Sequence, residues 1–103
     1  MKKLKELPVG CQKDIKKALK ILKQNGATEI YIFASIAKGN FNKKSDIDTA
    51  IRGVKQEKFY KVASILMFEI EKEIDLIDLD DENDKFALML IDKNILVRID
   101  NIL

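Results

Sequence analysis

The stretch Ser45-Asp46-Ile47-Asp48-Thr49-Ala50-Ile51 places two carboxylates two residues apart at the start of an apolar run. The run predicts a β-strand over residues 46–52, and side chains on a strand alternate between its two faces. Asp46 and Asp48 would therefore share one face, where their like charges repel each other. A hard divalent cation with oxygen ligands is the usual partner of such a pair. The stretch thus predicts a metal site on a strand.

The sequence on either side predicts helices and further strands. Apolar residues at helical spacing indicate helices, and short apolar runs between turn signals such as Asn25-Gly26 indicate strands. In chain order we expect a helix over residues 12–24, strands over 28–33 and 46–52, a helix over 57–72, a strand over 74–79, a helix over 83–91 and a closing strand over 95–99. This order predicts an α/β (α+β) fold, with a small mixed β-sheet flanked by helices.

Length and composition limit the classes of protein that the chain can represent. Its 103 residues predict a single domain, 1–103, and its net charge of +2 argues against direct nucleic-acid binding. No apolar run is long enough to cross a membrane. The single cysteine, Cys11, cannot form an intrachain disulfide, and we expect a cytoplasmic protein. The absence of histidine excludes Ser-His and Cys-His catalytic pairs.

A third carboxylate on the next predicted strand completes a candidate metal site. Asp75 is flanked by apolar residues in Ile74-Asp75-Leu76, and an aspartate in such surroundings is rarely found without a partner. Asp78 is the second candidate. Because Asp75 and Asp78 are an odd number of residues apart, they point to opposite faces, and only one of them can reach the same site.

The turn after the first predicted strand has the composition of an anion-binding loop. In Ala34-Ser35-Ile36-Ala37-Lys38-Gly39 the small residues allow close approach of backbone to a ligand, Ser35 offers a hydroxyl and Lys38 adds positive charge. Anion donors beside clustered carboxylates make chemical sense if a metal ion bridges the two. The implied ligand is a metal-bound polyphosphate.

Together, Phe33-Ala34-Ser35-Ile36-Ala37-Lys38-Gly39 and Ser45-Asp46-Ile47-Asp48-Thr49-Ala50 resemble the signature of the polymerase-beta-like nucleotidyltransferase superfamily. That signature is a Gly-Ser turn followed by an Asp-Xaa-Asp pair. In its Ser-Asp-Ile-Asp motif and its short length, the chain is most similar to the minimal nucleotidyltransferases (MNT). These proteins pair with HEPN-domain proteins in prokaryotic two-gene modules. The resemblance spans residues 31–79.

The resemblance implies a nucleotidyltransferase core that uses ATP and two Mg²⁺ ions. It implies transfer of AMP to a hydroxyl of a HEPN toxin, so that the chain acts as an antitoxin. The implied catalytic and metal-binding residues are Asp46, Asp48 and Asp75. The residues implied to bind the nucleotide phosphates are Ala34, Ser35, Lys38, Gly39 and Ser45.

Two features keep a second interpretation open. The turn has Ala34 where the family normally has glycine, which motivates the alternative that the protein neutralises its partner by binding alone. In addition, the helix over residues 83–91 is apolar on more than one side, with Phe86 and Leu90 along one and Leu88 and Ile91 along another. This pattern favours burial against a second chain, either the partner or another copy.

Overall fold

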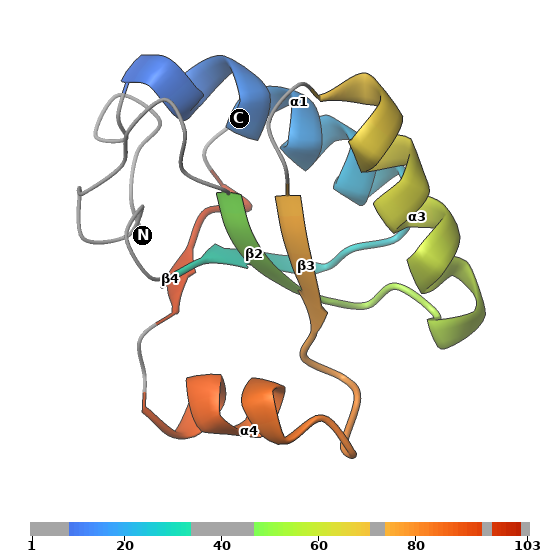
Figure 1. The fold of residues 1–103 in the computed structure, drawn as a ribbon, viewed down its shortest axis with the longest axis vertical. Helices are drawn as coiled ribbons and strands as arrows, with labels where there is room; N and C mark the ends of the chain where they lie inside the picture. The colour runs from blue at the N-terminus through green and yellow to red at the C-terminus, as the bar shows by residue number, and fades with distance from the viewer. Residues whose placement is uncertain (1–8, 34–46, 71–73, 94–95, 102–103) are drawn as a thin grey trace.

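The computed structural model describes residues 9–33, 47–70, 74–93 and 96–101. These residues form three helices and a four-stranded sheet in the predicted order (Figure 1). The elements are α1 (Val9–Gln24), β1 (Glu29–Ile32), β2 (Ile47–Arg52), α3 (Gln56–Glu69), β3 (Ile74–Asp78), α4 (Lys85–Asp92) and β4 (Val97–Arg98). Within this part of the chain, no helix is long and apolar enough to cross a membrane.

The sheet is mixed and has the strand order β3-β2-β1-β4. β1 pairs antiparallel with both β2 and β4, whereas β2 pairs parallel with β3. A parallel pair needs a long crossover connection, and α3 supplies it between β2 and β3. The predicted small mixed sheet with flanking helices is confirmed.

Helices cover both faces of the sheet, and each face has its own apolar core. α1 and α3 lie on one face, and α4 lies on the other (Figure 1). The larger core joins α1 and α3 to the sheet, and its fully buried members include Leu19, Ile51 and Leu66. The smaller core packs Ala87 and Leu90 of α4 against the sheet.

Truncating Leu19 or Leu66 to Ala should lower the free energy of unfolding by about 2–5 kcal/mol, as is usual for buried leucines.

α3 differs from its predicted form in length and in its buried side. The helix ends at Glu69 rather than at residue 72, because Ile70 adopts extended backbone angles and buries its side chain in the larger core. The apolar repeat in the sequence also predicts that Met67 shares one side of this helix with Phe59, Val62, Ala63, Leu66 and Ile70. That prediction is wrong, since Met67 is 79% exposed. One core can cover only one side of a helix, and Val62 and Leu66 occupy that side.

Two glycines with left-handed backbone angles lie against each other where α1 and β2 end. Gly26 has a φ of 102° and follows α1, where the N–H of Ala27 donates to the carbonyl of Leu22. This bond confirms the predicted helix stop. Gly53 has a φ of 98° and follows β2. A Cβ on Gly53 would lie 2.7 Å from Oγ1 of Thr28 and 2.8 Å from the carbonyl oxygen of Gly26.

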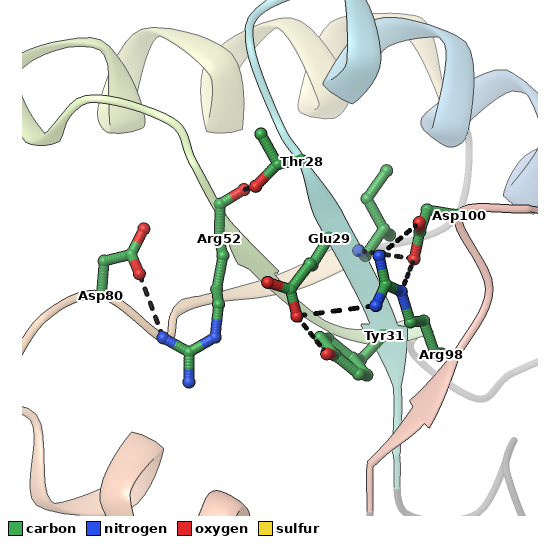
Figure 2. Close-up of polar contacts among 8 residues, drawn as sticks. Thr28, Glu29, Tyr31, Arg52, Asp80, Arg98 and Asp100 are labelled. Atoms are coloured by element: carbon green, nitrogen blue, oxygen red, sulfur yellow. Dashed lines mark hydrogen bonds and ion pairs between the residues drawn. The ribbon is translucent and has the colours of Figure 1, made fainter.

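An ion-pair network fastens β4 to β1 (Figure 2). Arg98 donates to both carboxylate oxygens of Asp100, at 2.7 and 3.1 Å, and lies 4.0 Å from Glu29, which accepts a hydrogen bond from the Tyr31 hydroxyl. The buried N–H of Ile30 also donates to Asp100, at 3.3 Å. Burial alone would raise the pKa of Asp100, but the hydrogen bonds from Arg98 and Ile30 outweigh it and hold the pKa below its usual value.

Replacing Gly53 by alanine should lower the free energy of unfolding by about 3 kcal/mol, through the left-handed backbone and the crowding at Thr28. Gly26→Ala is the matched control, because its φ is similar but its nearest contact is 3.7 Å. It should cost only about 1–2 kcal/mol. Urea denaturation measures both variants. Equal losses of unfolding free energy in the two variants would mean that crowding around Gly53 adds nothing to the cost of its replacement.

Asp100→Asn should lower the free energy of unfolding by about 1 kcal/mol at neutral pH, because the charged hydrogen bonds from Arg98 are weakened. The carboxylate's folded pKa is depressed, so its contribution is present above the unfolded pKa of about 3.9 and is lost as the pH falls through the folded value. The difference in the free energy of unfolding between wild type and Asp100→Asn should therefore disappear in acid. Thermal melts at a series of acid pH values measure this difference, and a difference that stays constant would contradict the role given to Asp100. Asp92→Asn, which changes an exposed aspartate, is the control.

Candidate active site

Two of the predicted carboxylates are direct neighbours across the parallel strand pair. Asp48 of β2 is the register partner of Asp75 of β3. Register partners on adjacent strands point to the same face of a sheet and lie about 5 Å apart at the backbone. Asp48 is half-buried, and Asp75 is exposed. The pair thus forms an accessible double carboxylate near the beginning of both strands.

The opposite face of the same strands holds this pair in place. Thr49 and Leu76, the next register pair along, point to the α1 and α3 side, where Thr49 is 3% exposed and Leu76 packs against the larger core. A slip of one residue would put the carboxylates into that core and the apolar side chains into water. The register, and with it the proximity of Asp48 to Asp75, is therefore fixed by apolar burial.

The described residues on either side of the remaining predicted site residues lie near Asp48. Ala34, Ser35, Lys38, Gly39, Ser45 and Asp46 lie outside the described residues. Phe33 precedes the segment that carries them, and its N–H donates to the carbonyl oxygen of Asp48 at 3.2 Å. Ile47 follows it and begins β2. Both ends of the segment are thus attached to neighbouring strands at the Asp48 end of the sheet.

α4 packs on the same face of the sheet, beyond the carboxylate pair. Ala87 and Leu90 pack with Ala50, two residues beyond Asp48 on β2. Phe86 contacts Phe33 edge to face, with ring centroids 6.0 Å apart and an interplanar angle of 61°. α4 therefore packs against Phe33, the residue that precedes the predicted phosphate-binding turn.

Asp78 does not belong to this site. It is the register partner of Ile51, whose side chain lies in the larger core on the α1 and α3 side. There Asp78 lines a cleft with Phe59 and Tyr60 of α3. Partial burial, together with the charges of neighbouring aspartates, raises the pKa of Asp78. Of the two candidates for the third carboxylate, only Asp75 shares a face with Asp48.

The donor set fits a hard divalent cation. Asp48 and Asp75 contribute carboxylate oxygens, the ligand type that Mg²⁺ uses together with waters and substrate phosphates. Within the described ranges, no group of three or more Asp, Glu, Cys or His side chains gathers around one point. A third protein ligand would have to come from the segment between Phe33 and Ile47, where Asp46 lies.

Sequence reasoning missed two polar groupings outside this site. One is the Arg98 network, whose only signal was the spacing of Arg98 and Asp100. The other pairs Arg52 with Asp80 at 3.1 Å across the end of β2 (Figure 2). Asp80 also accepts a hydrogen bond from the N–H of Gly53 at 2.8 Å. Both depend on which strands become neighbours, and this was not visible in the sequence.

Several solved structures share the fold. One is a toxin–antitoxin with AMP-PNP, 24% identical, with a TM-score of 0.62, covering 81% of this chain and 69% of that chain. Another is the toxin–antitoxin MntA-HepT, 22% identical, with a TM-score of 0.58 and coverage of 84% and 69%. A third is a tri-AMPylated Shewanella oneidensis HEPN toxin in complex with MNT antitoxin, 21% identical, with a TM-score of 0.58 and the same coverage.

No curated protein matches the sequence. The sequence profile of the family described as polymerase beta, nucleotidyltransferase, matches residues 15–101. This match includes β2 and β3 with Asp48 and Asp75. The chain therefore belongs to the polymerase beta nucleotidyltransferase family.

Proposed function

We propose that this protein is a Mg²⁺-dependent nucleotidyltransferase that moves AMP from ATP to a hydroxyl group of a HEPN toxin, and so acts as its antitoxin. The observation that carries the proposal is the register pairing of Asp48 with Asp75 in a chain of this family. Support comes from two structures of similar fold, one a toxin–antitoxin with AMP-PNP and one containing an AMPylated HEPN toxin beside an MNT antitoxin.

In the proposed site, Asp46 and Asp48 hold Mg²⁺, and Asp75 completes a second metal position or accepts a proton. Bound Mg²⁺ would neutralise the triphosphate and favour in-line displacement at the α-phosphorus. The acceptor oxygen bonds to that phosphorus as the bond to the β-phosphate oxygen breaks. AMP is thereby esterified to the acceptor and pyrophosphate leaves. Asp75, exposed beside Asp48, is suited to take the proton of the attacking hydroxyl.

The turn between β1 and β2 supplies the phosphate contacts in this proposal. Ser35 and Lys38 contribute a hydroxyl and a positive charge, and the backbone around Ala34, Gly39 and Ser45 contributes N–H donors. The bond from Phe33 to the Asp48 carbonyl supports this role, because it fixes the start of the turn next to the carboxylates. Triphosphate and metal would then meet at one end of the sheet.

Asp48→Asn and Asp75→Asn should each reduce the rate of AMP transfer by about 10²- to 10⁴-fold. Each substitution removes a carboxylate that would bind the metal or accept the proton of the attacking hydroxyl. Asp78→Asn is the matched control, because it changes the same chemistry on the opposite face of β3 and should leave the rate nearly unchanged. Incubation with labelled ATP, Mg²⁺ and a HEPN protein from the same genome measures the transfer. Undiminished labelling by Asp75→Asn would remove that residue from the mechanism.

A second candidate function is neutralisation of the toxin by binding alone, which is favoured by Ala34 in place of the family's glycine. A Cβ there would restrict a left-handed backbone and crowd a phosphate.

The two functions differ in what Asp46→Asn/Asp48→Asn does in cells that express the toxin. Under the transferase proposal the double variant still forms the complex, as measured by co-purification, but protection of growth is lost. Full protection by the double variant would establish binding as sufficient and would contradict the transferase as the source of neutralisation.

A further inference from the structure

The outer side of α3 carries three large exposed side chains in a row. Tyr60 and Met67 are each 79% exposed, and Phe68 is 89% exposed. Met67 and Phe68 follow Tyr60 by seven and eight residues, about two helical turns, which places all three side chains on one side of the helix, hereafter the α3 stripe. Together they expose on the order of 400–500 Å² of largely apolar surface, as large as the largest patch on a typical monomer.

A cleft that contains three carboxylates adjoins this stripe. The cleft has a volume of about 260 Å³ and runs between the first turns of α3 and the loop after β3. It is lined by Gln56, Phe59, Tyr60, Leu76, Ile77, Asp78, Asp81 and Asp84, hereafter the acidic cleft. Tyr60 belongs to both features, so the stripe and the cleft form one continuous surface.

The three carboxylates of the acidic cleft have hydrogen bonds but no cation. Asp78, Asp81 and Asp84 each accept from backbone N–H groups of their own loop or of the start of α4. None of them forms an ion pair within the described part of the chain, whose salt bridges use Glu29, Glu69, Asp80 and Asp100 instead. Burial is the main reason why the pKa of Asp78 is raised, and the negative charges of Asp80, Asp81 and Asp84 raise it further.

We infer that the α3 stripe and the acidic cleft form a docking surface for an amphipathic helix of a partner protein, with apolar residues along one side and lysine or arginine at one end. The apolar side chains would cover Tyr60, Met67 and Phe68, and the cation would enter the cleft. Charge complementarity selects this occupant. Helices are suited to it because Tyr60 to Phe68 span only about 12 Å, or two to three turns.

A second copy of this chain, packed through its own α3 stripe, would bring no basic residue to the acidic cleft from its last α3 turn or from its own cleft lining. If two α3 stripes packed together in antiparallel fashion, each cleft would face the end of the other α3, and the last turn of α3 contains no basic residue. In parallel packing the two clefts would face each other and repel. Apolar contact alone therefore does not satisfy the whole surface, whereas a basic amphipathic partner does.

This surface is separate from the candidate active site. Asp78 lies on the α1 and α3 side of the sheet, at the end of β3, whereas Asp48 and Asp75 lie on the α4 side near the beginning of their strands. A partner held at the α3 stripe would leave the carboxylate pair open to an acceptor. The inference goes beyond the proposed function, and it holds whether or not the chain transfers a nucleotide.

The test uses a short synthetic helical peptide with leucines along one side and arginines at one end, titrated into the ¹⁵N-labelled protein. The backbone amide resonances that shift on addition of the peptide should be mainly those of α3 and of residues 78–84. Asp78→Asn/Asp81→Asn should weaken binding about tenfold, since asparagine keeps the shape and the hydrogen bonds but removes the charge. Met67→Ser/Phe68→Ser should weaken it at least as much. The matched controls are Asp14→Asn/Asp92→Asn for charge and Leu88→Ser/Ile91→Ser for the exposed apolar residues of α4.

Three results would overturn the inference. One is a peptide that does not bind or whose shifts lie mainly on α4. Another is binding that is equally strong to the Asp78→Asn/Asp81→Asn variant, or to a peptide with glutamates in place of the arginines. The last is a wild-type dimer in sedimentation equilibrium that becomes monomeric in Met67→Ser/Phe68→Ser, because a second copy would then be the occupant. Thermal melts confirm that each variant is folded.

Discussion

The parallel pairing of β2 with β3 is the constraint on which the rest of this structure depends. The α3 crossover makes β3 run in the same direction as β2, and burial of Ile51 and Leu76 on the α1 and α3 side fixes the register. Once the register is fixed, Asp48 must lie beside Asp75. Two charged side chains are thus held together by the apolar residues that alternate with them, and not by any attraction of their own.

The same alternation divides the chemistry of the molecule between two faces. On the α4 side, the carboxylate pair shares the sheet with a small core that stops short of it. On the α1 and α3 side, β3 ends in Asp78, which lines a cleft together with the first turns of α3 and lies on the opposite face from the candidate metal site. One strand of five residues therefore serves a candidate active site at its beginning and a candidate docking surface at its end.

Much of this fold could be predicted from the sequence, because periodicity reveals which residues share a face. The helical spacing of Ile15, Leu19 and Leu22 and the Asn25-Gly26 stop predicted α1 and its end at Gln24, although the helix begins at Val9 instead of residue 12. Alternation separated Asp75 from Asp78. Periodicity does not reveal which element covers a face, which is why the exposure of Met67 and the pairing of Arg98 with Asp100 were missed. The turn residues Ala34 to Ser45 and Asp46 lie outside the described residues, so their roles remain predictions from the sequence.

The most direct test of the central claim, that strand register builds a metal-nucleotide site, is a crystal structure with Mn²⁺ and AMP-PNP in which anomalous scattering locates the metal. Mn²⁺ should lie within about 2.0–2.6 Å of a carboxylate oxygen of Asp48, as hard cations do with oxygen ligands. Asp75 should contact the metal or one of its waters, and the triphosphate should lie against the turn that follows Phe33. Nucleotide bound with its metal touching neither Asp48 nor Asp75 would contradict this claim.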